Sequence, residues 1–331
     1  MVTIDWQQIS AAAAHLRAGR LVAMPTETVF GLAGDATNAD AVAAIFAAKS
    51  RPAINPLIAH VATHVAAERL ATFSPMADAL AAAFWPGPLT LVLPQLPECA
   101  VSRLATAGLD SIAVRAPDHP VAQALLEAVD LPLAAPSANP SGQISPTRAN
   151  HVHDGLGNHV AMVLEAASAC TVGVESTIVQ PMADHLCVLR PGAVTVDMLE
   201  EVTNVPVTAH KTGDERGAVR APGMLRAHYA PRAPLRMNVT APAPDEIWLG
   251  FGPDAERQPA QTLWLSERGD VSEAAARLFD LMHQADALCA AGIPDLASTV
   301  PRGIAVAPIP ALGLGVAIND RLARATLGRE N

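Results

Sequence analysis

Four short polar segments stand next to predicted strands in the first two thirds of the chain, and their side chains suit the binding of an anionic ligand. They are residues 25–32 (PTETVFGL), 49–60 (KSRPAINPLIAH), 135–147 (APSANPSGQISPT) and 174–177 (VEST). Sheets of α/β proteins place their ligands at strand ends. The four segments together therefore predict one ligand site.

Basic residues are scarce in this region, so their positions are informative. Residues 1–205 hold nine Lys and Arg against eighteen Asp and Glu, a net charge of −9. Four of the nine lie in or beside the predicted site: Lys49, Arg51, Arg115 and Arg190. A ligand with phosphates and a carboxylate would need such a set. Arg115 also ends an apolar strand, where a half-buried arginine needs an anionic partner.

Each segment has a simpler explanation when it is taken alone. Residues 25–28 could cap a helix or form a turn. Lys49 and Arg51 follow a predicted helix, whose C-terminal end favours cations. The serines and prolines of residues 137–147 fit ordinary turns, and a lone His60 is more often structural than a ligand. The coincidence of all four segments is what favours a site.

Common nucleotide and metal signatures are absent from the sequence. It contains no Walker A loop, no GxGxxG after a strand, no GxSxG elbow and no HExxH. The four cysteines form no CxxC pair, which argues against a zinc knuckle. An anion site in this chain must therefore use side chains and ordinary backbone turns.

Hydrophobic spacing predicts the elements that must position these residues. Strands are expected over residues 21–24, 57–61, 89–93, 111–115, 132–135, 162–165, 177–180 and 187–190. Helices are expected from Asp5 to Gly19 and over residues 39–48, 75–85 and 119–129. Strands and helices that alternate with short connections indicate an open α/β sheet.

The chain changes character after residue 205. Residues 206–232 carry five Lys and Arg against two acids, with Gly and Pro interleaved, which is typical of a linker. Tyr229, the only tyrosine, lies there and could cover a nucleotide as part of a lid. Strands over 246–252, 261–265 and 304–309 and helices over 272–288 and 316–326 predict a smaller α/β domain. The predicted domains are thus 1–205 and 233–331, joined by the linker.

Composition excludes several function classes. The net charge of −10 and only eleven aromatic residues argue against a basic or aromatic surface for nucleic acid. No apolar run is long enough for a membrane span, and the first residues lack the pattern of a signal peptide. Unclustered cysteines suggest reduced thiols, so we expect a cytoplasmic protein without membrane contact.

The motifs, in their order and spacing, resemble the YrdC-type threonylcarbamoyl-AMP synthases in their two-domain, Sua-type form. Besides the four segments, the resemblance rests on WPGPLT (85–90), SIAVR (111–115), LRPG (189–192), PGM (222–224) and HYAP (228–231). Phe30 replaces a tyrosine common in the family. The resemblance implies an open twisted mixed sheet as catalytic domain and a smaller Rossmann-like C-terminal domain, which matches mainly by position.

The resemblance also implies the reaction: L-threonine, bicarbonate and ATP give threonylcarbamoyl-AMP and pyrophosphate. By the same resemblance, threonine is held by Thr28, His60, Arg115, Ala135 and Ser176. ATP is held by Arg51, Asn55, Ser111, Ser137, Ser145, Arg190 and Tyr229. The residues expected at the phosphates or carbamate are Lys49, Arg51, Ser137 and Asn139. Mg²⁺ is implied by the triphosphate, with no protein metal site and with Glu27 and Glu175 as outer-sphere partners.

Separate proteins are expected to transfer the product to tRNA, so contact of this chain with tRNA would be indirect.

The sequence leaves two alternative functions open. A YrdC-like domain could bind RNA without synthase activity, although the charge of −9 opposes that. A carbamoyl-transfer maturation enzyme would also carry an acylphosphatase-like module and CxxC zinc fingers, which this sequence lacks.

Overall fold

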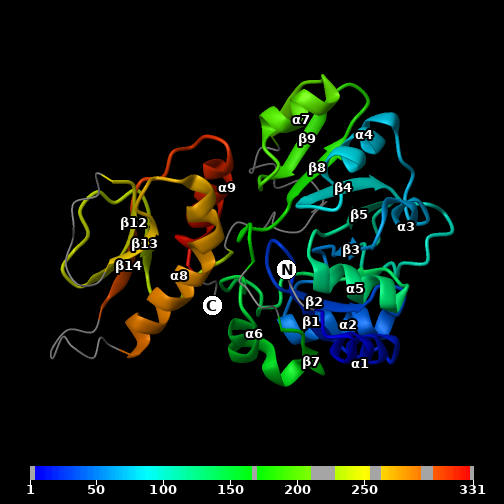
Figure 1. Cartoon of the computed structure of the whole chain (residues 1–331), viewed down its shortest axis with the longest axis horizontal. Helices are drawn as coiled ribbons and strands as arrows, with labels where there is room; N and C mark the ends of the chain where they lie inside the picture. Colours follow the sequence, from blue (N-terminus) through cyan, green and yellow to red (C-terminus); the bar gives the residue numbers. More distant parts are fainter. Residues whose placement is uncertain (1–3, 166–169, 210–227, 254–261, 292–300, 329–331) are drawn as a thin grey trace.

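The chain folds around two sheets, a large one from its first two thirds and a small one from its last third (Figure 1). The computed structural model describes residues 4–165, 170–209, 228–253, 262–291 and 301–328. The segment predicted as a linker and lid lies mostly outside these residues, at 210–227. Among the described residues, no helix is long and apolar enough to cross a membrane.

The large sheet has ten strands in the order β10-β9-β8-β4-β5-β3-β6-β2-β1-β7. It mixes antiparallel pairs such as β4–β5 with parallel pairs such as β3–β5, which confirms the expected open mixed sheet. The strands are β1 Val22–Met24, β2 Gly31–Asp35, β3 Ile58–His60, β4 Leu89–Pro94, β5 Ser111–Arg115, β6 Leu133–Ala134, β7 Met162–Val163, β8 Thr177–Pro181, β9 Leu186–Arg190 and β10 Val207–Ala209.

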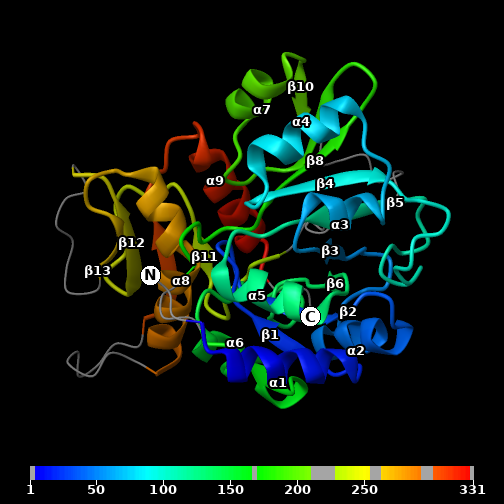
Figure 2. The same cartoon turned by 45° about the vertical axis from the view of Figure 1, so that its right-hand side comes forward.

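Helices cover both faces of this sheet (Figure 2). They are α1 Trp6–Arg17, α2 Ala39–Lys49, α3 His64–Glu68, α4 Pro75–Phe84, α5 Pro120–Val129, α6 Ala149–Leu156 and α7 Val196–Thr203. On β1, Val22 and Met24 join the core under α1 and α5, whereas Ala23 joins the core under α2 and α4. This alternation is the period of two that a strand buried on both faces requires. A short 3₁₀ helix, Gly157–His159, follows α6.

Helix starts follow the expected capping chemistry. The Asp5 carboxylate accepts hydrogen bonds from the backbone amides of Gln7 and Gln8 at the start of α1. Ser74 caps α4 ahead of Pro75, which occupies the first turn of the helix. Local sequence thus determines where these two helices begin.

The small sheet is parallel, with strand order β11-β14-β12-β13. Its elements are β11 Leu235–Arg236, β12 Glu246–Phe251, β13 Thr262–Ser266, α8 Val271–Ala291, β14 Gly303–Val306 and α9 Leu314–Ala325. Both helices pack on the face turned toward the large sheet, so they form the contact layer between the two parts (Figure 1). This confirms the smaller α/β unit.

The two parts of the chain approach each other closely at the segment that precedes β8. Gly173 has a φ of +74°, and a Cβ there would lie 2.3 Å from the carbonyl oxygen of Ala275 in α8. Arg148 also pairs with Asp280 of α8, with nitrogen–oxygen distances of 2.6 and 2.9 Å. The predicted domain boundaries at residues 205 and 232 stay a prediction. The first residues of the predicted linker form β10, which pairs with β9 at the edge of the large sheet.

Candidate active site

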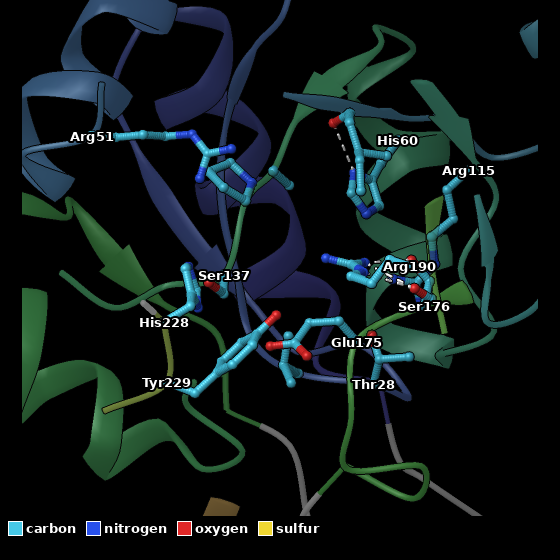
Figure 3. Close-up of a pocket in the computed structure, with 14 residues that line it drawn as sticks. Thr28, Arg51, His60, Arg115, Ser137, Glu175, Ser176, Arg190, His228 and Tyr229 are labelled. Carbon is cyan, nitrogen blue, oxygen red and sulfur yellow. Dashed lines mark hydrogen bonds between the residues drawn. The ribbon is translucent and has the colours of Figure 1, made fainter. Parts of the chain in front are cut away.

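A small cavity lies where the ends of several strands meet His228 and Tyr229 (Figure 3). The lining residues are Thr28, Val29, Arg51, Ile58, His60, Arg115, Ala135, Pro136, Ser137, Glu175, Ser176, Arg190, His228 and Tyr229. The cavity thus gathers residues from all four polar segments.

Three buried arginines give the cavity its positive character. Arg190, at the end of β9, donates from Nε and Nη2 to the backbone oxygen of Ser176 at 3.1 and 2.9 Å, and from Nη2 to its Oγ at 3.1 Å. Arg51 donates to the backbone oxygens of Asn55 and Pro56. Burial lowers the pKa of Arg51 and of Arg190 to about 10, so both stay protonated at neutral pH. Such a cluster attracts an anionic ligand.

The third arginine, Arg115, has the anionic partner that its position requires. Its Nη2 donates to Oε1 of Glu27 at 2.5 Å, and its Nε donates to the backbone oxygen of Gly87 at 3.3 Å. Both members of the ion pair are buried. The second carboxylate oxygen of Glu27 is buried without a partner. A carboxylate ligand in the cavity would therefore share Arg115 with Glu27.

His60, at the end of β3, presents a neutral imidazole beside Arg115. Burial and the charge of Arg115 lower its pKa to about 3. Its Nδ1 lies 3.2 Å from the backbone oxygen of Ile58, which fixes the ring orientation. A neutral ring can exchange hydrogen bonds with a ligand hydroxyl but offers no charge.

The wall opposite Arg51 and His60 is formed by Tyr229 and Glu175 (Figure 3). Tyr229 is 1% exposed with a φ of +64°, and its ring stacks on Phe279 of α8 at 5.5 Å. Burial, with the nearby charge of Glu175, raises the pKa of Tyr229 to about 12, so its hydroxyl keeps its proton. The Glu175 carboxylate is the one acidic group among the described lining residues.

Nine of the fourteen predicted site residues line the cavity. They are Thr28, Arg51, His60, Arg115, Ala135, Ser137, Ser176, Arg190 and Tyr229. The other five do not line it: Lys49, Asn55, Ser111, Asn139 and Ser145. Their roles, like those of the nine, stay predictions.

Lys49 and Asn139 support the cavity wall from behind. The Lys49 ammonium donates to the backbone oxygens of Ser137 and Asn139, and burial lowers its pKa well below the usual range. The Asn139 amide donates to the backbone oxygens of Pro140 and Gln143. These contacts hold the turn that carries Ser137.

The remaining three occupy different surroundings. Asn55 is buried, and neither polar atom of its amide has a partner, which marks a place where a ligand could bond. Ser145 donates from Oγ to the Glu175 carboxylate at 2.5 Å. Ser111 begins β5 and pairs with Pro94 of β4, half-buried.

The sequence interpretation missed parts of the lining. Val29, Ile58 and Pro136 are apolar and carry no chemical signal, while His228 lies in the HYAP motif next to Tyr229. Glu175 was expected only as an outer-sphere partner of Mg²⁺. Phe30, the departure from the family pattern, is buried in the large core and does not line the cavity.

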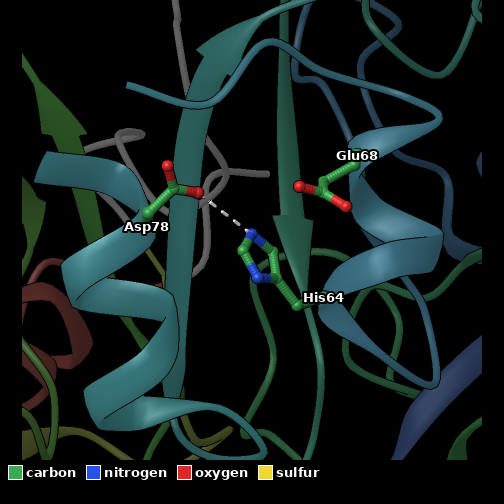
Figure 4. Close-up of side chains that lie close together, drawn as sticks. All are labelled: His64, Glu68 and Asp78. Atoms are coloured by element: carbon green, nitrogen blue, oxygen red, sulfur yellow. Dashed lines mark ion pairs between the residues drawn. The ribbon is translucent and has the colours of Figure 1, made fainter. Parts of the chain in front are cut away.

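A separate histidine–carboxylate group lies on the surface between α3 and α4 (Figure 4). The ligand atoms of His64, Glu68 and Asp78 lie within 4.8 Å of one another, and Nε2 of His64 is 3.3 Å from the Asp78 carboxylate. Both carboxylate residues are exposed. An ordinary surface ion pair accounts for this arrangement.

Comparison with known proteins supports the resemblance over the whole chain. A family model described as "Telomere recombination" (Sua5, YciO and YrdC proteins) matches residues 14–192, and one described as "Threonylcarbamoyl-AMP synthase, C-terminal domain" matches residues 194–326. The threonylcarbamoyl-AMP synthase of Bacillus subtilis is 38% identical over 328 residues, which cover 97% of this chain and 94% of that protein. The synthase of Pyrococcus abyssi is 43% identical over 231 residues, 69% of this chain and 67% of that protein.

Solved structures agree with the sequence comparisons. The crystal structure of P. abyssi Sua5 complexed with L-threonine matches this chain with a TM-score of 0.84 and 34% identity, covering 98% of this chain and 95% of that one. The similarity therefore includes both sheets and the layer between them. On these grounds the chain belongs to the threonylcarbamoyl-AMP synthase family.

Proposed function

We propose that this chain is a nucleotidyltransferase that converts L-threonine, bicarbonate and ATP into threonylcarbamoyl-AMP and pyrophosphate. The threonine amine and bicarbonate form a carbamate with loss of water. A carbamate oxygen then attacks the α-phosphorus of ATP, and pyrophosphate leaves with the bonding electrons. The observation that carries the proposal is the convergence of three buried arginines on one cavity in a chain of this family.

Threonine is assigned to the side of the cavity around Arg115. The guanidinium is the natural partner of the substrate carboxylate, because arginine–carboxylate bonds are among the strongest in proteins. His60 and Thr28 supply neutral polar groups for the substrate hydroxyl and carbamate. Ser176 and the backbone of Ala135 complete this side.

ATP is assigned to the side around Arg51 and Arg190. The two guanidiniums would face the phosphates together with Ser137 and the Tyr229 hydroxyl. Asn55, Ser111 and Ser145 belong to this side by resemblance, and the unpartnered Asn55 amide supports its assignment. In this proposal Lys49 and Asn139 contribute to ATP binding indirectly, because they hold the turn that carries Ser137.

Positioning and charge neutralisation supply most of the catalysis in this proposal. A carbamate is a weak nucleophile, so it must be held in line with the leaving pyrophosphate. Arginines fixed in a buried site stabilise the charge that develops on the phosphate oxygens without reorganising. In this proposal the burial of the arginines contributes to catalysis, because it keeps their positive charges fixed beside the phosphates.

Mg²⁺ is proposed to arrive with ATP. Both oxygens of Glu175 already accept hydrogen bonds, one from Ser145 and one from Arg321. Glu175, the one carboxylate of the described lining, is thus already paired with a guanidinium and a hydroxyl, so the residues present do not fit a resident metal site. We derive no step through the metal.

The product is a reactive mixed anhydride, which a further group-transfer reaction must consume. We place that transfer on separate proteins that modify tRNA, with no direct need for this chain to bind tRNA. A cytoplasmic location belongs to the same proposal.

Pyrophosphate release tests the proposal directly. The purified chain should release pyrophosphate from ATP only when L-threonine and bicarbonate are both present. Equal release without threonine would refute the synthase assignment. RNA binding without any threonine-dependent release would favour the RNA-binding alternative instead.

A further inference from the structure

The C-terminal part of the chain inserts one charged side chain into the wall of the catalytic cavity. Arg321, on α9, is 0% exposed and is the largest fully buried side chain among the described residues. Its Nε donates to Oε2 of Glu175 at 2.9 Å, and its Nη2 donates to the Glu175 backbone oxygen at 3.3 Å. The guanidinium thus reaches from the small domain to a residue that lines the cavity.

The surroundings hold this guanidinium in one place. Its Nη1 donates to the Asp320 carboxylate at 2.9 Å, and its central carbon lies 5.5 Å from the centre of the Tyr229 ring. The other oxygen of Glu175 accepts from Ser145. The carboxylate is therefore fixed from both domains, with one oxygen bonded to each.

We propose that Arg321 is a positioning residue of the active site, which neutralises Glu175 so that the cavity presents a net positive charge to the phosphates of ATP. The inference rests on the proposed function in that ATP is the ligand. Without Arg321, a buried carboxylate would face the triphosphate and repel it. A full site on this view needs the C-terminal domain, because no described residue of the first domain forms an ion pair with Glu175.

The electrostatics of the cavity agree with this role. Burial raises the pKa of Glu175, but the charges of Arg321 and Arg190 outweigh it and bring the pKa down to about 2. The other titratable groups that act on or near Glu175 are Lys49, His228 and Tyr229. His228 has a pKa of about 3 and Tyr229 of about 12, so neither titrates near neutral pH. Glu175 also raises the pKa of Lys49, so the cleanest comparison is between the native chain and Arg321→Met, which both keep Glu175 and Lys49.

The sign of the pH dependence follows. In the native chain Glu175 is ionised and neutralised throughout the range between about pH 5.5 and 9, so it adds no pH dependence to ATP binding. Removal of Arg321 takes away the largest of the charges that lower the pKa of Glu175, so burial shifts this pKa upward, although Arg190 and Ser145 still act against that shift. ATP should then bind well at the acid end, where the carboxylate is protonated, and poorly at the alkaline end, where it is charged.

The experiment compares Arg321→Met, Glu175→Gln, the double variant and Arg321→Lys with the native full-length chain. KM for ATP and kcat come from pyrophosphate release, and Kd for ATP comes from calorimetry, each across that pH range. Arg321→Met should weaken ATP about 10- to 100-fold at the alkaline end, the effect of one lost charge-assisted interaction, with a smaller change in kcat. The double variant should recover most of the affinity and follow the pH profile of the native chain, which includes the ionisation of ATP itself. Arg321→Lys keeps the charge but not the three-nitrogen fork, so its loss at the alkaline end should be smaller than that of Arg321→Met.

Arg148→Met is the matched control, because it breaks the Arg148–Asp280 ion pair between the same two domains away from the cavity. It should leave the KM for ATP and its pH profile unchanged. Equal effects of Arg148→Met and Arg321→Met, or no recovery in the double variant, would overturn the proposal.

Two outcomes keep the test decisive. If Arg321→Met does not fold, Glu175→Gln alone decides: it makes the cavity more positive, so ATP should bind at least as tightly, and a tenfold loss, about 1.4 kcal/mol, would overturn the proposal. If the native chain binds ATP but makes no threonylcarbamoyl-AMP, the proposed function fails. The pH pattern of ATP affinity would still confirm or refute the role of Arg321.

Discussion

Replacement of Arg115 by methionine should have two effects. It should weaken the binding of threonine, and it should destabilise the fold because Glu27 loses its ion-pair partner. Loss of a charge-assisted bond to the substrate carboxylate costs about 1.5–3 kcal/mol, which is roughly a 10- to 100-fold rise in the threonine Kd. The same change leaves Glu27 buried without its 2.5 Å partner. Breaking one side of a buried ion pair lowers the free energy of unfolding by about 3–5 kcal/mol.

A second substitution distinguishes the two effects. Glu27→Gln combined with Arg115→Met removes both charges, so most of the stability should return while threonine still binds weakly. Calorimetric titration with L-threonine measures the first effect, and denaturant unfolding measures the second. Native threonine affinity in Arg115→Met, or full recovery of threonine binding in the double variant, would refute the assignment of Arg115.

Three further predictions follow from the same structure. Arg51→Ala should raise the calorimetric Kd for ATP by about 10- to 100-fold and leave threonine within a few-fold; equal losses for both ligands would contradict the division of the cavity. Gly173→Ala should lower the free energy of unfolding by about 1–3 kcal/mol more than Gly108→Ala, which has a similar positive φ but nothing within 4 Å; equal losses would contradict the close approach to α8. His60 and His228, with pKa values lowered to about 3, are neutral when folded, so stability is full above about pH 6.5 and should fall toward about pH 4.5, by roughly 1.4 kcal/mol per pH unit for each. His228→Asn should flatten that slope in denaturant titrations, and an unchanged slope would contradict the assignment.

The polar segments predicted residues that the structure brings together around one cavity, because these residues are local in the sequence and lie at strand ends. Arg115 was the most informative single residue, since a charge at the end of an apolar strand requires a partner, and Glu27 provides it. Arg321 gave no such signal. It stands among Asp320 and Arg324 on an amphipathic helix, where alternating charges are typical of a solvated face.

Three strands were not predicted: β2, β10 and the two-residue β11. The first two have a physical reason that the sequence shows. Residues 31–35 (GLAGD) contain two glycines and no β-branched residue, so their propensity for a strand is low. They form β2 because pairing with β1 and β6 satisfies their backbone. β10, at the sheet edge, pairs only with β9 and lies in a segment whose later residues are rich in charge and glycine. In both cases tertiary contacts outweigh local propensity.

The central claim is that one cavity joins threonine, bicarbonate and ATP. Its most direct test is the reaction of the native chain with ¹³C-labelled bicarbonate, L-threonine and ATP, followed by mass spectrometry of the nucleotide products. The account predicts threonylcarbamoyl-AMP that carries the label, formed in step with pyrophosphate and absent when any substrate is omitted. Pyrophosphate or AMP formed without a labelled threonine adduct would contradict it.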